Sequence, residues 1–441
     1  MKTPRQSAFD ILYKIYKDSA YSNLALDSFL DSSSYSGADR AFVCALVYGV
    51  CERTITLDYQ LSLYLTQPLK KLKPQVLTVL RMGAYQILFM DKVPVSAAVN
   101  ESVKLAKNNS AAFAAGLVNA VLRKVAAAGL KLPKDENSLS FRSVKYSCPE
   151  WMLKLWSDSY GKENADKIAE FSLGAPQTVI RVNTLKTDCD SLLASLSKKG
   201  IAASKSNTAE NALILEKPGS LKNLDEYKNG LFHVQDTASQ LCCKALGAKS
   251  GETVLDICSA PGGKTFTVAE MMDGGGNITA CDIYPSRLSL IEDGAKRLGI
   301  KSIHTLLNDG SVYNKDLPLA DKILCDAPCA GLGVIRRKPE IRFKTAAEVD
   351  KLPEIQYSIL TISAKYLKPG GVLVYSTCSL NKKENEDVFY RFLGEHKDFE
   401  PIRVLPEVER AAEDGDTLTL MPHIHGSDGF FISAFRRRNT P

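Results

Sequence analysis

The sequence predicts a multi-domain protein with three parts: an all-α domain in residues 1–135, a small α+β module in 141–230, and a C-terminal α/β domain in 231–441. Three patterns lead to this prediction. Apolar residues follow a helical period through the first third, strand and helix signals mix in the middle, and short apolar runs alternate with helical segments after residue 231. The last pattern is typical of a Rossmann-like, doubly wound parallel sheet.

The N-terminal domain is predicted to be helical because apolar residues recur three or four positions apart, as at Ala8, Ile11, Leu12 and Ile15. Pro74 and Pro94 fall where first helical turns should begin, a position that suits a residue without an amide hydrogen. Residues 111–128 are nearly all small and apolar and predict a core helix. The polar stretch 130–140 breaks the period and is a candidate linker.

The middle module combines both kinds of signal. Residues 151–169 have a helical pattern, whereas 178–184 alternates like a strand and 212–216 reads as a second short strand. The sequence therefore predicts a small α+β module here.

The C-terminal domain is predicted to contain a parallel sheet because its strands read as buried on both faces and are separated by helices. The predicted strands are residues 253–258, 277–283, 302–307, 322–327 and 371–377. Two further segments, 417–422 and 429–437, are predicted to close the sheet as an antiparallel pair.

The composition is that of a soluble globular protein, since 45% of the 441 residues are hydrophobic and 24% are charged. No stretch approaches the roughly 18 uninterrupted apolar residues of a membrane-spanning helix, and the N-terminus has no apolar run of the secretory kind. We therefore expect no membrane association. Eleven cysteines without regular spacing indicate reduced thiols and a cytoplasmic location rather than a disulfide framework.

The positive charge is concentrated at the N-terminus. Residues 1–135 contain 17 Lys and Arg against 10 Asp and Glu, which leaves 39 against 40 for the rest of the chain. For charge alone, a solvated helical surface is the simpler interpretation. The alternative is a module that contacts a polyanion such as RNA, because phosphates are neutralised by Lys and Arg.

A ligand site is predicted where the first strand of the sheet runs into CSAPGGKT, residues 258–265. Ligands of open parallel sheets sit beyond the carboxyl ends of the strands. Gly262 and Gly263 let the backbone approach a ligand, and the following helix N-terminus favours an anionic group. A nucleotide-hydrolysing P-loop is the alternative, but its first glycine is replaced by Cys258.

Acidic residues follow the next three predicted strands. Asp282 comes 19 residues after Gly263, where an acid is placed to hold ribose hydroxyls. Asp309 follows the third strand and Asp326 ends the fourth. One such acid is often only a helix cap. Three of them beside a glycine-rich turn predict a nucleoside ligand.

Two cysteines are predicted at the same edge of the sheet: Cys329 in DAPCAGLG, after the fourth strand, and Cys378 in STCS, after the fifth. Most of the other cysteines are interpreted as small buried apolar residues, namely Cys44, Cys51, Cys148, Cys189, Cys242, Cys243, Cys281 and Cys325. We predict no metal site, because no C-x-x-C pair or histidine spacing of a zinc site occurs.

Together, CSAPGGKT, the acidic strand ends, DAPCAGLG and STCS resemble the RNA (cytosine-C5) methyltransferases of the Nol1/Nop2/Sun family. The resemblance covers residues 141–437, and the helical N-terminal segment looks like the NusB-like domain that bacterial 16S rRNA methyltransferases of this family carry. It implies a class I methyltransferase fold in the C-terminal domain, a small-subunit ribosomal RNA substrate, and no protein partner.

The resemblance also implies roles for individual residues. Cys378 is expected to be the nucleophile, and Cys329 to help release the product. S-adenosylmethionine is expected to be bound by Cys258, Ser259, Ala260, Pro261, Gly262, Gly263, Lys264, Asp282, Asp309 and Asp326. The rival is a non-catalytic RNA-binding or ribosome assembly factor built on a methyltransferase-like fold.

Cytosine C5 methylation explains why such groups are needed. Carbon 5 is a poor nucleophile until a thiolate adds at C6, which is covalent catalysis. Asp326 is expected to act as the general acid at N3. Lys264 either favours a thiolate, holds a carboxylate, or is a solvent-exposed cation. The basic residues after Cys329 either hold RNA phosphates or form a solvated loop: Arg336, Arg337, Lys338, Arg342 and Lys344.

Overall fold

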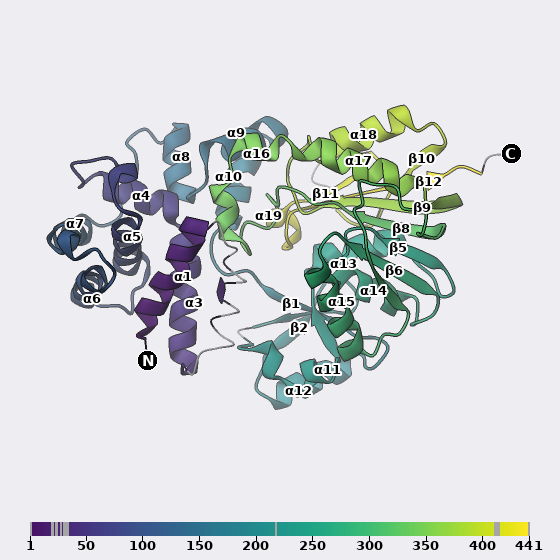
Figure 1. Ribbon diagram of the computed structural model, residues 1–441, viewed down its shortest axis with the longest axis horizontal. Helices are drawn as coiled ribbons and strands as arrows, with labels where there is room; N and C mark the ends of the chain where they lie inside the picture. The colour runs from purple at the N-terminus through teal and green to yellow at the C-terminus, as the bar shows by residue number, and fades with distance from the viewer. Residues whose placement is uncertain are drawn as a thin grey trace. The chain divides into compact units, whose positions relative to one another are not determined.

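The computed structural model describes residues 2–18, 22, 25, 26, 29, 35–216, 218–409 and 415–439. The chain forms two compact units, each made of two pieces (Figure 1). The first unit comprises Met1–Ala175 with Ile335–Ala346, and the second comprises Pro176–Val334 with Ala347–Pro441.

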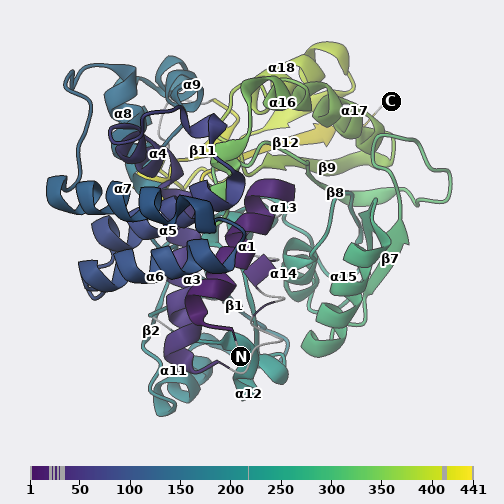
Figure 2. The same ribbon diagram turned by 60° about the vertical axis from the view of Figure 1, so that its left-hand side comes forward.

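The first unit is helical, as predicted. Its side chains at helical spacing, such as Leu12, Val79 and Leu122, are fully buried in one core, and α5, α6 and α7 pack against one another (Figure 2). The α-helices are α1 (Pro4–Asp18), α3 (Gly37–Glu52), α4 (Thr54–Ser62), α5 (Pro74–Phe89), α6 (Val95–Asn108), α7 (Ala115–Ala128), α8 (Leu139–Tyr146), α9 (Glu150–Tyr160) and α10 (Lys162–Phe171).

The predicted helix boundaries in this unit are confirmed in part. Pro74 opens α5, and Pro94 is the residue just before α6. The helix predicted over 111–128 begins with a short 3-10 turn and becomes α-helical only at Ala115. The helix predicted over 151–169 is interrupted at Gly161, whose φ of 82° lies in the left-handed region that favours glycine.

A short segment that follows Cys329 in the sequence packs into the helical unit. It contains the 3-10 helix η4 (Pro339–Phe343). Arg342 is 3% exposed; its Nε donates to the carbonyl of Ser147 at 3.0 Å and its Nη2 to the carbonyl of Ser172 at 2.9 Å. Trp151 Nε1 donates to the carbonyl of Lys344 at 3.2 Å. Arg342 therefore neither holds phosphate nor lies in a solvated loop, because its guanidinium satisfies buried backbone carbonyls.

We predict that Arg342→Met lowers the free energy of unfolding by about 2–4 kcal/mol, because it leaves several buried carbonyl oxygens without a donor. Urea unfolding would measure the change. The matched control is Lys338→Ala, in the same segment but exposed, which should stay within about 0.5 kcal/mol of wild type. Equal stabilities of the two variants would contradict a structural role for Arg342.

The second unit begins with a four-stranded antiparallel sheet in the order β2-β3-β1-β4. Its elements follow a βαββαβ sequence, which with this strand order is the ferredoxin-like arrangement. One face of the sheet packs against the helices around Ile180, Leu213 and Phe232, all fully buried. The elements are β1 (Thr178–Val182), α11 (Cys189–Lys198), β2 (Ala203–Lys205), β3 (Ala212–Leu215), α12 (Asp225–Lys228) and β4 (Phe232–Val234).

The rest of the second unit is built on a large mixed sheet in the order β10-β12-β9-β8-β5-β6-β7, with β11 paired to β12. The five predicted central strands are present and parallel, and the predicted antiparallel closing pair is β11 and β12. The strands are β5 (Thr253–Asp256), β6 (Asn277–Asp282), β7 (Ile303–Leu307), β8 (Ala320–Asp326), β9 (Leu367–Thr377), β10 (Phe399–Ile402), β11 (Leu418–Leu420) and β12 (Phe430–Arg437).

Both faces of this sheet are covered, as its apolar strands predict. Successive residues alternate between two cores: Val254 and Leu324 face one, while Leu255 and Ile323 face the other. The first core is closed by α13 (Thr237–Leu246), α14 (Gly263–Met271) and α15 (Pro285–Leu298), and the second by α17 (Leu352–Ala364) and α18 (Glu386–Glu395) (Figure 1). Two short helices, α16 (Ala346–Val349) and α19 (Pro422–His425), lie in the connections.

Candidate active site

The glycine-rich turn lies between β5 and α14, as the sequence predicts. Gly262 is buried and has a φ of 102°, and a Cβ at this position would lie 2.6 Å from the ring of Phe266. Both conditions require glycine. Ser259 donates from its backbone amide and from its hydroxyl to the carbonyl of Cys281, each at 2.8 Å. The turn is therefore fixed against the neighbouring strand β6, with its backbone kept open to a ligand.

Asp256, at the end of β5, is a buried acid that sequence reasoning did not single out. Thr265 Oγ1 donates to its Oδ2 at 2.6 Å. Its Oδ1 has no hydrogen-bond partner among the residues that the structure describes. Burial raises the pKa of Asp256 from 3.8 to about 7. An acceptor of this kind beside the glycine-rich turn is suited to a donor group on a ligand.

The other acids lie at the strand ends where they were predicted. Asp282 ends β6, is 6% exposed, and accepts from the backbone amide of Tyr284 at 2.9 Å. Asp309 lies beyond β7 and is exposed, and its Oδ1 accepts from the backbone amide and the hydroxyl of Ser311 at 2.9 and 2.6 Å. The second oxygen of Asp282 lies 3.9 Å from the exposed guanidinium of Arg287, a long contact that a polar ligand at this edge can replace.

Asp326 forms an ion pair with Lys264 that links the strand β8 to the glycine-rich turn. Lys264 Nζ donates to Asp326 Oδ2 at 2.7 Å, and Ser376 Oγ donates to Asp326 Oδ1 at 2.8 Å. Burial disfavours the charged lysine, but Asp326 together with the nearby Cys242 and Cys243 outweighs burial, and the pKa of Lys264 is raised. Of the roles considered for Lys264, the structure favours the one in which it holds a carboxylate.

Cys329 and Cys378 lie beside each other, as their strand-end positions predict. Their Sγ atoms are 3.3 Å apart, although 49 residues separate them in the sequence. Hydrogen bonding to Cys378, burial, and the carboxylates of Glu384 and Asp326 raise the pKa of the Cys329 thiol well above its ordinary value. The thiolate form of Cys329 is therefore disfavoured beside Cys378, and the two sulfur atoms can share one hydrogen bond.

The remaining cysteines behave largely as predicted. Six of the eight that were interpreted as small apolar residues are buried, while Cys44 and Cys189 are half-buried. Burial raises the pKa of Cys148, Cys242, Cys281 and Cys325 to about 12. Within the described ranges, no group of three or more His, Cys, Asp or Glu side chains is arranged to hold a metal ion.

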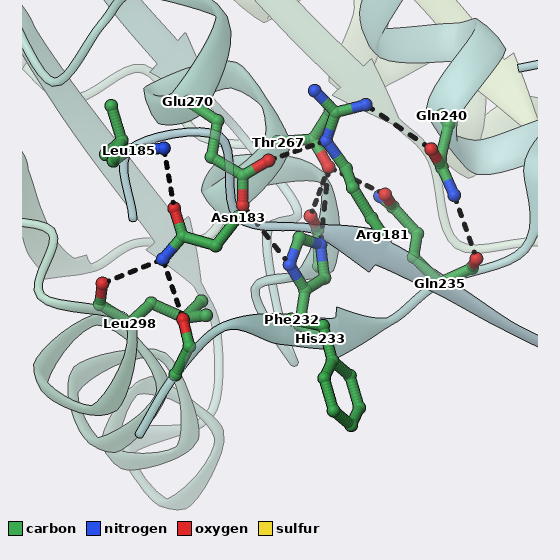
Figure 3. A network of polar contacts seen from close by, with 12 residues as sticks. Arg181, Asn183, Leu185, Phe232, His233, Gln235, Gln240, Thr267, Glu270 and Leu298 are labelled. Atoms are coloured by element: carbon green, nitrogen blue, oxygen red, sulfur yellow. Dashed lines mark hydrogen bonds and ion pairs between the residues drawn. The ribbon is translucent and has the colours of Figure 1, made fainter. Parts of the chain in front are cut away.

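A buried polar network connects the ferredoxin-like sheet to α14, the helix that follows the glycine-rich turn (Figure 3). Arg181, on β1, donates through Nε to Glu270 of α14 at 2.6 Å. Thr267, one turn earlier on α14, donates to Gln235 at 2.6 Å and is 3.1 Å from the carbonyl of Gly263. His233 Nδ1 lies 3.4 Å from Glu270 Oε1, within ion-pair range but without hydrogen-bond geometry. The ferredoxin-like sheet is thus tied directly to the helix that begins at the turn.

Several polar residues of the site escaped sequence reasoning. Asp256 ends the first strand and had the same signal as the acids that were predicted. Ser376, Gln356, Glu384 and Asn385 are fully buried. Glu384 and Asn385 lie in a stretch whose polarity alone predicts a surface, whereas Ser376 and Gln356 lie in apolar segments and were not singled out. No helix in the described part of the chain is both long and apolar enough to cross a membrane.

Comparison with known proteins finds three family matches along the chain. Residues 2–127 match the NusB family, residues 148–222 match the ferredoxin-like domain of RsmF/B-like methyltransferases, and residues 243–436 match the 16S rRNA methyltransferase RsmB/F model.

Two relatives and one solved structure extend this similarity over nearly the whole chain, and a second solved structure over about two thirds of it. Probable ribosomal RNA small subunit methyltransferase B of Bacillus subtilis is 39% identical over 98% of both chains, and that of Synechocystis is 34% identical over 99% of this chain and 100% of the relative. The crystal structure of PH0851 is 25% identical with a TM-score of 0.86 over 99% of both chains. A methyltransferase homologue from Pyrococcus horikoshii is 30% identical with a TM-score of 0.61, over 68% of this chain and 99% of that one.

The fold and the site thus define a class I methyltransferase whose cofactor is S-adenosylmethionine. The chain belongs to the ribosomal RNA small subunit methyltransferase B family. The site fits this cofactor on one observation: the buried Oδ1 of Asp256, beside the glycine-rich turn, has no hydrogen-bond partner among the described residues and suits a donor such as an ammonium group.

We predict that Asp256 makes the protein less stable as the pH rises from 5 to 8. A carboxyl whose pKa is raised on folding binds its proton more tightly in the folded state, so its contribution is complete below about pH 4 and is lost as the pH passes through about 7. Urea midpoints without added cofactor should fall with pH in the wild type and fall less steeply in Asp256→Asn. Parallel profiles would contradict the raised pKa.

Proposed function

We propose that this protein methylates carbon 5 of a cytosine in 16S ribosomal RNA, with Cys378 as the nucleophile. The observation that supports this most directly is the 3.3 Å separation of the Cys329 and Cys378 sulfur atoms at the ligand-binding edge of the sheet. The names of the relatives support the substrate, since they are ribosomal RNA small subunit methyltransferases.

The proposed mechanism begins with Cys378. When bound, S-adenosylmethionine supplies an electrophilic methyl group. The Cys378 thiolate adds to C6 of the cytosine, which makes C5 electron-rich enough to be methylated. A base must then take the C5 proton, and the C6–S bond breaks so that Cys378 leaves as a thiolate. Cys329, whose Sγ lies 3.3 Å from that of Cys378, is placed to assist this release.

Asp326 is proposed to manage the charge that this addition places on the ring. Protonation at N3 removes the charge, and general-acid help of this kind contributes about 10²–10⁴-fold. Asp326 Oδ2 accepts from the Lys264 ammonium at 2.7 Å. For this role Asp326 must itself carry the proton that it supplies. Lys264, whose raised pKa makes it a weak acid, is proposed to hold the Asp326 carboxyl group in place.

Cofactor binding is proposed to use the turn and the strand ends described above. Asp282 is placed for the ribose hydroxyls, and Asp256 Oδ1 for the ammonium of the methionyl group. The proposed cofactor-binding residues are Cys258, Ser259, Ala260, Pro261, Gly262, Gly263, Lys264, Asp282, Asp309 and Asp326, with Asp256 added.

The target cytosine must leave its base stack to reach two side chains at the end of a sheet, so we propose a single-stranded or extruded nucleotide as the substrate. The basic excess of residues 1–135, with 17 Lys and Arg against 10 Asp and Glu, supports contact with the RNA backbone.

The direct test is transfer of radiolabelled methyl groups to ribosomal RNA from cells that lack this protein, followed by mapping of 5-methylcytosine. Wild-type protein should label one or few cytosines of 16S RNA. We predict that Cys378→Ala lowers the rate at least about 100-fold, because the covalent step is lost. Cys189→Ala, on α11 of the ferredoxin-like module, is the control and should retain the wild-type rate. Near-normal turnover by Cys378→Ala would refute the assignment of Cys378 as the nucleophile.

A second variant tests whether Cys329 acts in product release while Cys378 acts as the nucleophile. We predict that Cys329→Ala still attaches to RNA through Cys378 but releases it slowly, so that a protein–RNA species survives denaturing electrophoresis. Cys329→Ala/Cys378→Ala should form no such species. If the single variant shows no retarded band while it binds RNA and cofactor normally, Cys329 has no part in release. Absence of methyl transfer by an intact wild-type protein would instead favour a non-catalytic RNA-binding factor.

A further inference from the structure

Glu384 is a fully buried carboxylate in the turn between β9 and α18. Its Oε1 accepts from Ser379 Oγ at 2.7 Å and from Asn381 Nδ2 at 3.0 Å. Its Oε2 accepts from the backbone amide of Ala330 at 2.7 Å and from Gln356 Nε2 at 2.9 Å. A carboxylate offers about four acceptor positions, so these four donors use all of them.

The donors belong to the two loops that hold the reactive sulfur atoms. Ala330 directly follows Cys329, and Ser379 directly follows Cys378. Gln356 reinforces the first loop, because its Nε2 also donates to the carbonyl of Pro328 at 3.0 Å. The Glu384 carboxylate therefore accepts a hydrogen bond from the residue that follows each cysteine, and so connects the two loops.

Asn385, which directly follows Glu384 and directly precedes α18, holds the second loop in the same way. Its Oδ1 accepts from Thr377 Oγ1 at 2.5 Å, and its Nδ2 donates to the carbonyl of Ser379 at 2.8 Å. These bonds fall on both sides of Cys378. The turn formed by Glu384 and Asn385 thus fixes the backbone around Cys378. Glu384 also connects it to the residue after Cys329, while the amide of Gly333, farther along that loop, donates to the carbonyl of Cys378 at 3.0 Å.

We propose that Glu384 is a positioning residue that sets the distance between Cys329 and Cys378. The proposal rests on the proposed function for its catalytic meaning, but the distance itself is a property of the folded protein. Glu384 acts through the loops and not on the substrate, since it is 0% exposed and its acceptor positions are occupied.

A carboxylate is needed because all four partners donate hydrogen bonds, two to each of its oxygens. Glutamine would present an amide group on one side, where it would face donors. On the Oε1 side, the oxygen of Asn381 already accepts from the amide of Lys383 at 3.2 Å. In Glu384→Gln, a side-chain amide on this side would therefore place its N–H donors against the Nδ2 donor of Asn381. Asn381→Asp in the same chain would supply an acceptor for it and restore the pairing.

The experiment measures the distance between the two thiols with phenylarsine oxide, which exchanges its oxygen for two thiol sulfurs and releases water. Wild-type protein should bind one equivalent at Cys329 and Cys378, identified by mass spectrometry of the peptides, and Cys378→Ser should not. We expect Glu384→Gln to bind it at least about tenfold more weakly, the effect of losing a buried hydrogen bond to a charged group. Glu384→Gln/Asn381→Asp should recover to within about threefold of wild type.

Methyl transfer gives the second readout. Glu384→Gln should lower kcat, while the rise in melting temperature caused by S-adenosylhomocysteine stays at its wild-type value. Glu395→Gln, at the far end of α18 and with an exposed side chain, is the matched control and should change neither readout. If wild-type protein transfers no methyl group, the proposed function fails, but the arsenical measurement still tests Glu384.

Wild-type arsenical affinity in Glu384→Gln would overturn the proposal, as would failure of Asn381→Asp to restore affinity in a folded double variant. If Glu384→Gln does not fold, Ser379→Ala tests the proposal instead, because it removes one hydrogen-bond donor to Glu384 and keeps the Glu384 carboxylate. It should weaken arsenical binding about threefold, and an unchanged affinity would count against the proposal.

Discussion

The pairing of β8 with β9 is the constraint on which the site depends. Asp326 is in register with Ser376, so Cys329 and Cys378 follow at three and two residues beyond a matched pair. A slip of two residues along a strand moves its end by about 6.6 Å, which is twice the 3.3 Å between the sulfur atoms. A slip of one residue would turn the side chains to the opposite core. The double-faced core that fixes this register is therefore also what brings the two thiols together.

Charged groups inside the protein occur where segments distant in the sequence must be held. Glu384 joins the two cysteine loops, Arg342 joins its own segment to Ser147 and Ser172, and Arg181 pairs with Glu270 between the small sheet and α14. A buried charge is costly unless its hydrogen bonds are complete. Each of these groups therefore tolerates few alternative arrangements of the chain around it, and the apolar cores alone impose no such restriction.

The sequence predicts those features that depend on local pattern. The central strands were recognised because burial on both faces leaves continuous apolar runs, and Cys329, Cys378, Asp282 and Asp326 were located because they end such runs. The edge strand β10 was missed, since it is four residues long and contains a proline. Glu384 and Arg342 were not recognised as buried, because burial of a charge depends on partners contributed by segments far away in the chain, and neither composition nor periodicity records them.

The segment Ile335–Ala346 has a consequence for the order in which the chain becomes structured. It belongs to the helical unit, yet it is synthesised after the ferredoxin-like module and the first four parallel strands. On a ribosome, the carbonyls of Ser147 and Ser172 have no such donor until Arg342 emerges, 170 residues after Ser172. The helical unit is thus the first to be translated but not the first that can be completed, and a nascent chain that stops before this segment lacks part of its own N-terminal architecture.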